Sequence, residues 1–145
     1  MATSAQGVFE LTMALMDELN EQGAADTSDT AEYKHRSLEI LNVLQGELFP
    51  FSDIYAATEP GKRAIAVPII NFTAEIQSLD DFICRSVLPY GLAAHLLMDE
   101  NPGAASFFQQ RYDELKMQLS RGMAAVSEEI EDLYGGIEHG EYAYW

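Results

Sequence analysis

Residues 101–120 read NPGAASFFQQRYDELKMQLS, and they contain the clearest helix start in the chain. Asn101 is a favoured N-cap residue, and Pro102 takes the first helical position, where proline is tolerated. The apolar residues that follow lie three or four positions apart: Phe108, Tyr112, Leu115 and Leu119. This spacing predicts an amphipathic helix that reaches at least Ser120. Gly122 weakens it, and a last helical piece is expected from Met123 to Tyr134.

A shorter helical region precedes this one, at residues 78–98. Ser78 is expected to cap it, with Asp81 at the third helical position. Pro89 interrupts the pattern, because proline lacks an N–H group and clashes with the carbonyl four residues earlier. We therefore expect a short helix, a break, and a second helix from Pro89 to Met98.

The first 49 residues predict a helical hairpin. The first helix is expected from Val8 to Gln22, with Gly23 as its C-terminal cap. Asp29 and Glu32 have the spacing of a capping box, and a second helix should run from about Thr30 to Phe49. The two apolar stripes comprise Val8, Leu11, Leu15 and Leu19, then Tyr33, Ser37, Ile40, Leu41, Leu44 and Leu48. Two such helices with a short connection should pack antiparallel.

The middle of the chain, residues 50–77, has no helical period and contains several prolines. Phe72, Ala74 and Ile76 alternate with polar residues, which predicts one half-buried strand. A hairpin or an ordered extended arm are the alternatives. Long ordered loops in small domains are usually functional, so this segment is a candidate for binding a partner.

These segments predict an all-α fold. We expect one domain over residues 1–145: a bundle of four to five helices with an irregular or partly extended middle and an aromatic tail. Its parts are a hairpin (about 8–49), the extended segment (50–77), a helical region (78–134) and the tail (135–145). A chain of 145 residues buries one core of ordinary size.

The chain is strongly acidic, with 24 acidic and 8 basic residues and a formal charge of −16. The basic residues are scattered, which disfavours nucleic acids and anionic membranes as partners. We interpret the acidity mainly as a contribution to solubility. No apolar run reaches the roughly 18 to 20 residues that span a bilayer, and the N-terminus lacks the pattern of a secretory signal. Together with a lone Cys84, this predicts a cytoplasmic protein.

No catalytic constellation stands out, and we predict no catalytic, cofactor-binding or metal-binding residue. His35, His95 and His139 lie far apart, without metal-ligand spacing. The phosphate-binding and nucleophile-elbow motifs do not occur. Cys84 is expected to be a buried structural thiol. The chain is therefore expected not to be an enzyme.

One acidic run leaves an enzymatic alternative open. Residues 128–132 are similar to the E-E-x-x-E helices with which all-α nucleotide pyrophosphohydrolases hold magnesium. That chemistry needs further carboxylates that converge on the cation, and only Asp113 and Glu114 lie nearby. A solvated helix face is the simpler interpretation.

Two apolar groups are candidate interaction residues. Tyr142, Tyr144 and Trp145 end the chain, and such aromatic residues anchor interfaces. The tail is expected either to fold back on its own core or to dock on a neighbouring copy. The second group lies in the middle segment: Ile69, Ile70 and Phe72.

The order of the segments resembles the small phage head–tail connector proteins, also called head-completion or adaptor proteins. Three patterns carry the likeness: an L-x-x-L-N-x-L run within residues 37–44, L-P-x-x-L-A-x-x-L at 88–96, and an aromatic-acid pattern at 107–115. The resemblance covers most of residues 8–119 and implies a helical domain that forms a ring beneath the portal.

The resemblance implies a structural function in virion assembly. Its partners would be further copies of this chain and portal or tail proteins, with no cofactor. The protein would occupy the bacterial cytoplasm during assembly and then the virion, and an acidic lumen would let DNA pass without binding. An alternative from a different functional class is an acidic helical module that regulates a partner by mimicking DNA.

Overall fold

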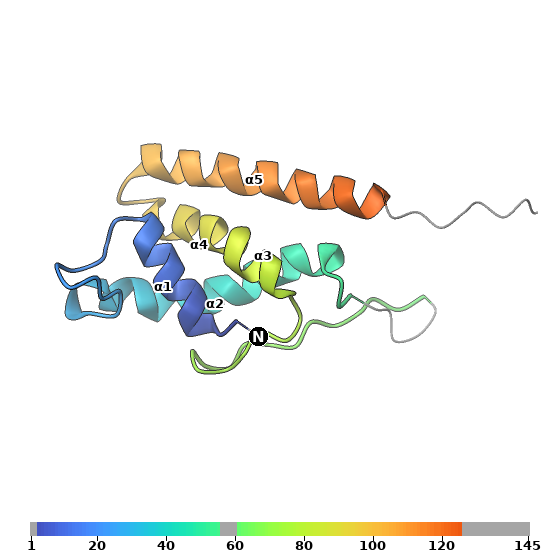
Figure 1. Ribbon diagram of the computed structural model, residues 1–145, viewed down its shortest axis with the longest axis horizontal. Coiled ribbons are helices and arrows are strands. Elements are labelled where there is room, and N and C mark those ends of the chain that lie inside the picture. The colour runs from blue at the N-terminus through green and yellow to red at the C-terminus, as the bar shows by residue number, and fades with distance from the viewer. Residues whose placement is uncertain (1–2, 56–60, 126–145) are drawn as a thin grey trace, which may run out of the picture.

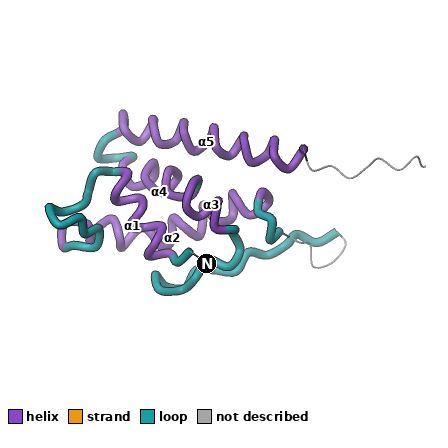
Figure 2. The backbone as a smooth tube through the Cα atoms, in the orientation of Figure 1, coloured by secondary structure: helices purple, strands orange, loops and turns teal. Residues whose placement is uncertain are grey.

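The computed structural model describes residues 3–55 and 61–125, and over these residues the fold is all-α (Figures 1 and 2). The α-helices are α1 (Ala5–Leu15), α2 (Ala31–Leu48), α3 (Asp81–Ser86), α4 (Leu88–Leu97) and α5 (Pro102–Ala125). Two 3-10 turns, η1 (Ser28–Thr30) and η2 (Phe49–Phe51), flank α2. The described residues form no strand, only an isolated bridge between Ser4 and Glu75.

Helix α4 lies at the centre of the fold. Its buried residues occupy every face: Leu88, Pro89, Gly91, Leu92, Ala93, Ala94, Leu96 and Leu97. A helix that is apolar all round must be surrounded by other elements. Accordingly, α1, α2, α3 and α5 all pack against α4, with α5 laid along one side of the body (Figure 1).

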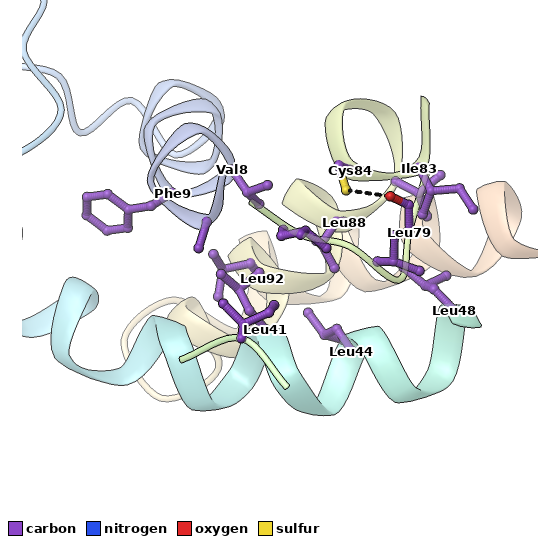
Figure 3. Close-up of a cluster of buried hydrophobic side chains, with 14 of the residues drawn as sticks. Val8, Phe9, Leu41, Leu44, Leu48, Leu79, Ile83, Cys84, Leu88 and Leu92 are labelled. Carbon is purple, nitrogen blue, oxygen red and sulfur yellow. Dashed lines mark hydrogen bonds between the residues drawn. The ribbon is translucent and has the colours of Figure 1, made fainter. Parts of the chain in front are cut away.

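The main core lies between α1, α2, α3 and α4, and Tyr112 of α5 completes it. Figure 3 shows Leu92 of α4 beside Leu41 of α2, with Val8 of α1 above them, whereas Phe9 points to the opposite side of α1 from Val8. Burial of one such side chain contributes about 1.5–3 kcal/mol. A smaller cluster joins α4 to α5 and consists of Ala93, Ala94, Leu97, Ala105 and Phe108.

Helix α1 is shorter than its hydrophobic pattern predicts, and the expected continuation to Gln22 is wrong. The helix stops because Asp17 adopts a left-handed conformation, with φ of 60°. The N–H of Glu18 then donates to the carbonyl of Met13 (2.9 Å), and that of Asp17 donates to Ala14 (3.2 Å). This is the two-bond motif that usually ends a helix at glycine.

The expected glycine cap lies instead in a separate turn. Gly23 has a positive φ of 80°, and its N–H donates to the carbonyl of Asn20 (2.9 Å). The Asn20 side chain also accepts from the N–H groups of Gln22 and Ala24. The chain therefore turns once at Asp17 and again at Gly23 before it reaches α2.

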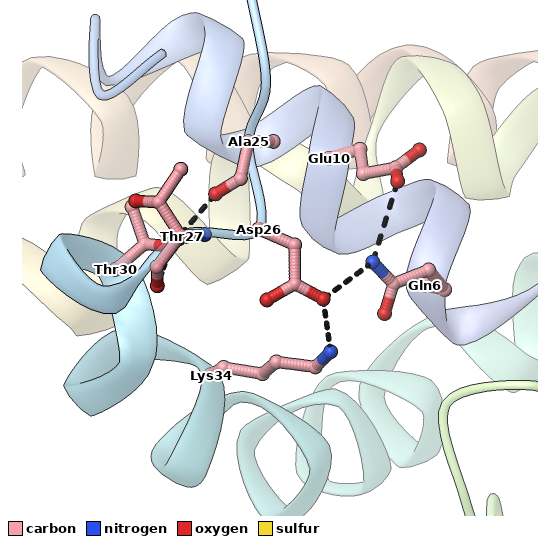
Figure 4. Close-up of polar contacts among 7 residues, drawn as sticks. All are labelled: Gln6, Glu10, Ala25, Asp26, Thr27, Thr30 and Lys34. Carbon is pink, nitrogen blue, oxygen red and sulfur yellow. Dashed lines mark hydrogen bonds and ion pairs between the residues drawn. The ribbon is translucent and has the colours of Figure 1, made fainter. Parts of the chain in front are cut away.

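The start of α2 also differs in detail from the expected Asp29–Glu32 capping box. The pair is Thr27 and Thr30: the N–H of Thr27 donates to Thr30 Oγ1 (3.1 Å), and that hydroxyl donates to the carbonyl of Ala25 (2.7 Å) (Figure 4). The turn η1 comes first, and α2 follows at Ala31. Asp26 accepts hydrogen bonds from Gln6 of α1 and Lys34 of α2, which ties the link to both helices.

The break at Pro89 is confirmed, because α3 ends at Ser86 and Pro89 lies in the first turn of α4. The cap of α3 is Asp80 rather than Ser78. Asn101 begins α5 as expected: its Oδ1 accepts from the N–H of Ala104 (3.2 Å). Helix α5 continues through Gly122 to Ala125, so no break occurs at this glycine, and the rest of the predicted last helical piece lies outside the described residues.

Candidate interaction surfaces

The first candidate surface is the extended segment of residues 61–76, here called the arm. It begins beyond the last turn of α2 and returns beneath the helices toward the N-terminus (Figures 1 and 2). The strand expected here is wrong, and the alternative of an ordered extended arm describes the segment. The arm forms no regular ladder of backbone hydrogen bonds with a neighbouring strand. Side chains of α2 hold its first part, and the backbone of the N-terminal residues holds its second part.

The side chain of Asn42 on α2 makes the hydrogen bonds that a neighbouring strand would otherwise make to the arm. Its Oδ1 accepts from the N–H of Ile69 (2.8 Å), and its Nδ2 donates to the carbonyl of the same residue (3.0 Å). Gln45 Nε2 donates to the carbonyl of Val67 (2.9 Å), while the N–H of Val67 donates to Ser78 Oγ (2.6 Å). These bonds satisfy the inward-facing polar backbone of the arm, which would otherwise destabilise the fold.

The far part of the arm is held by the N-terminus. The N–H of Gln6 donates to the carbonyl of Phe72 (2.8 Å), and that of Ile76 donates to Thr3 (2.9 Å). The Phe72 ring packs edge-on against Phe9, with centroids 6.1 Å apart. The Lys34 ammonium lies 5.0 Å from the Phe72 centroid. Phe72, Ala74 and Ile76 are more buried than the polar residues between them, so the predicted alternation is confirmed although no strand forms.

The outer face of the arm is apolar and exposed. Ile65 and Ile70 have exposed fractions of 83% and 80%, and Val67 is 47% exposed. Of the candidate residues, Ile70 therefore lies on the surface, Ile69 is buried and anchors the arm, and Phe72 is half-buried. Sequence reasoning missed Ile65 and Val67 as candidate interaction residues, although both alternate with alanine or proline along the same segment. The exposed residues Lys62 and Arg63 precede this face.

Other predicted residues do not meet in one place. Tyr142, Tyr144 and Trp145 lie outside the described residues, as does the acidic run 128–132. Asp113 and Glu114 are exposed on α5, where they contact Gln109 and Arg111 of the same helix.

The second candidate surface is a cleft of about 620 Å³ near the start of α2, here called the acidic cleft. Its lining residues come from the segment after α1, from η1 and α2, and from the end of α4 and the link to α5: Glu18, Asp29, Glu32, Tyr33, Arg36, Leu96, Asp99 and Glu100. Five carboxylates thus face one guanidinium. Leu96 and Tyr33 are both buried and supply an apolar floor.

The carboxylates of the acidic cleft repel one another. Burial raises the pKa of Glu18, and the neighbouring charges of Glu100, Asp17 and Asp29 raise it further. The Tyr33 hydroxyl donates to Glu100, and burial together with this hydrogen bond raises the pKa of the tyrosine. Arg36 lies against the Tyr33 ring, with 5.9 Å between guanidinium carbon and centroid. The cleft therefore favours a cationic group.

The acidic cleft is not arranged as a metal centre. Over residues 3–55 and 61–125, no three histidine, cysteine or acidic side chains lie close enough together to hold a metal ion. His35 is exposed on α2, and His95 is half-buried on α4.

Cys84 is buried in the main core. Its Sγ lies 3.8 Å from the carbonyl oxygen of Leu79 (Figure 3). Burial, with the charges of Asp81 and Asp80 as smaller causes, raises the pKa of the thiol to about 12. The thiolate, which is the nucleophilic form, is therefore not populated near neutral pH.

Among the helices of the described part of the chain, none is long and apolar enough to cross a membrane.

Comparison of this chain with protein-family models, with curated proteins and with solved structures found no match in any of the three.

Proposed function

We propose that this chain is a non-enzymatic assembly protein that forms homo-oligomers, as phage head–tail connectors form rings beneath the portal. The observation that carries the proposal is the arm. It presents Ile65, Val67 and Ile70 to solvent on a segment that the body holds in an extended conformation.

The arm has the properties of a preformed binding segment. Asn42 and Gln45 fix its inner edge, so that little conformational freedom is lost when the outer edge meets a partner. An extended segment also readily binds another chain through pockets for its side chains. Burial of a largely exposed isoleucine stabilises a contact by about 1.5 kcal/mol or more.

The resemblance to connector proteins supports the same proposal. Its three patterns fall on α2, α4 and α5, which together build the core of the fold. The proposed partners are further copies of this chain and a portal or tail protein. The net charge of −16 suits a ring that DNA crosses without binding. The proposed location is the bacterial cytoplasm during assembly and then the virion.

Several reactive groups are engaged in packing, which favours a structural role. The Cys84 thiol is buried against Leu79, and the Tyr112 hydroxyl donates to Glu47 Oε2 (3.0 Å). The hydroxyl of Thr3 donates to Asp81 Oδ1 (2.9 Å), which joins the N-terminus to α3.

Negative-stain electron microscopy of the full chain, alone at high concentration and mixed with a purified portal, tests the proposal. We expect rings, or portals that carry an added layer of density. A double variant, Ile65→Ser with Ile70→Ser, should abolish both while its thermal unfolding stays unchanged, because both side chains are exposed. Wild-type protein that forms no rings and leaves the portal bare would contradict the proposal.

A further inference from the structure

We propose that the arm of one copy docks in the acidic cleft of the next copy, so that the chains associate head to tail. This inference rests on the proposed function, since it names the two surfaces through which the oligomer forms. The occupant of the acidic cleft is thus the segment that begins at Lys62 and Arg63 and continues through Ile65 and Val67.

The basic tip of the arm, which begins at Lys62 and Arg63, and the acidic cleft lie at opposite ends of α2. The acidic cleft is built around the first two turns of α2, where Glu32, Tyr33 and Arg36 lie. Only the tip of the arm projects beyond the last turn of the same helix (Figure 1). Helix α2 has 18 residues, which at 1.5 Å per residue separates its ends by about 27 Å. A chain therefore cannot place the tip of its arm in its own acidic cleft, whereas the tip of a second copy can reach it.

Charge selects this pairing over other contacts between copies. Two chains of charge −16 repel each other, so a stable contact must bring basic groups of one against acidic groups of the other. Lys62 and Arg63 are the only adjacent basic pair in the sequence. The acidic cleft offers five carboxylates against the single guanidinium of Arg36. Its negative field would draw the arm toward the correct surface during association.

The apolar parts of the two surfaces are also complementary. Ile65 and Val67 follow the basic pair after Ala64 and are exposed, whereas Leu96 and the Tyr33 ring line the acidic cleft. A basic and apolar segment thus meets carboxylates around an apolar floor. Such an arrangement places charged contacts at the rim and apolar contacts at the centre, as in protein interfaces generally.

The contact joins two different surfaces, so each copy keeps one arm and one acidic cleft available for the next. Such heterologous contacts close into rings when the rotation per copy permits and otherwise extend into filaments. The docking thus accounts for how a small monomeric unit builds a ring.

Zero-length carbodiimide cross-linking tests the docking directly. Equal amounts of ¹⁵N-labelled and unlabelled full-length protein are mixed at high concentration, coupled, digested and analysed by mass spectrometry. We expect mixed-isotope peptides that join Lys62 to a carboxylate of the acidic cleft, such as Glu32 or Asp99. Links from Lys62 only to carboxylates elsewhere, such as those of residues 128–132, would overturn the inference.

Charge reversal supplies a second, independent test by sedimentation. Arg63→Glu and Glu32→Arg should each weaken self-association about tenfold or more, and the double variant should restore much of it. Asp113→Arg on α5 is the matched control, since it makes the same charge change outside the acidic cleft. Circular dichroism confirms that each variant is folded.

The outcomes separate this inference from the proposed function. Oligomers that form normally in both Arg63→Glu and Glu32→Arg would overturn the docking but leave the assembly role intact. Wild-type protein that remains monomeric with and without a portal would overturn both.

Discussion

The ring of Tyr112 lies directly on the backbone of Gly91. A β-carbon at residue 91 would lie 2.8 Å from Tyr112 Cε2 and 3.1 Å from Leu44 Cδ1. The Tyr112 hydroxyl donates to Glu47 of α2, so the ring is fixed at both ends. Helices α2, α4 and α5 therefore meet at one glycine, and the close approach of α5 depends on its missing side chain.

Gly91→Ala should lower the free energy of unfolding by about 1–3 kcal/mol, because the added methyl group overpacks a fixed aromatic ring. Gly46→Ala is the matched control. It lies inside α2 with no atom within 4 Å of the added carbon, so it should raise stability by about 0.5–1 kcal/mol. Urea unfolding measures both. A gain of stability in both variants would contradict the packing of Tyr112 on Gly91.

Asn42→Ala should loosen the arm at Ile69, because both hydrogen bonds to the Ile69 backbone are lost. The expected cost is about 1–3 kcal/mol, typical of a buried polar group left without its partner. Hydrogen exchange at the Ile69 amide should accelerate. Val43→Ala, at the neighbouring exposed position, should leave that amide unchanged. Unaltered protection of Ile69 in the Asn42 variant would show that the arm is held in another way.

Cys84 should resist alkylation by iodoacetamide at pH 8 in the folded protein and react fully in denaturant. The thiol is buried, and its pKa is raised to about 12, so almost no thiolate is present. A raised pKa also means that this group's contribution to stability is complete below about pH 9 and is lost as the pH rises toward 12. Rapid labelling without denaturant would contradict its place in the core.

Glu18 should make the protein more stable at pH 5 than at pH 7. Its pKa is raised in the folded state, so its contribution is complete below the ordinary value of 4.5 and is lost as the pH rises through the folded pKa. Glu18→Gln should therefore raise stability at pH 7 by up to about 0.5 kcal/mol and reduce the gain on acidification. Glu21→Gln, outside the acidic cleft, is the control for removal of one charge.

Further acidification should reverse this gain. The hydrogen bond from Lys34 lowers the pKa of Asp26, and that from Thr3 lowers the pKa of Asp81. Their contributions are present above about pH 3.8 and are lost as the pH falls through the folded values. Urea unfolding at pH 7, 5 and 3 follows the whole profile. Stability that falls steadily from pH 7 to pH 5 would contradict repulsion in the acidic cleft.

The helix starts and breaks that depend on local chemistry were predictable from the sequence. Asn101 and Pro102 begin α5, and Pro89 separates α3 from α4, because these residues restrict their own backbone. The end of α1 was not predictable in this way. Asp17 takes a conformation that usually requires glycine, so the periodic residues up to Leu19 suggested a longer helix.

The buried face of α1 shows why periodicity alone is insufficient. The sequence stripe included Leu11 and Leu15, which are 40% and 38% exposed. The residues of α1 that are buried in the structure are Ala5, Val8, Phe9, Thr12 and Met13. Both sets have helical spacing, and only the tertiary packing decides between them.

The position of the arm could not be predicted from the hydrophobic pattern of the sequence. Its position is set by the polar residues Asn42 and Gln45 on α2, which do not belong to the apolar stripe of that helix. The adjacent residues Ile69 and Ile70 are alike in sequence, yet one is buried and the other exposed. The acidic cleft likewise gathers residues from distant segments, so only the fold brings its carboxylates together.

Sedimentation velocity of the full chain over a rising concentration series tests the assembly role most directly. We predict that the wild type forms a discrete oligomer, while Ile65→Ser with Ile70→Ser remains monomeric under the same conditions. A wild type that sediments as a monomer at every concentration, and still does so when a portal is added, would contradict the account.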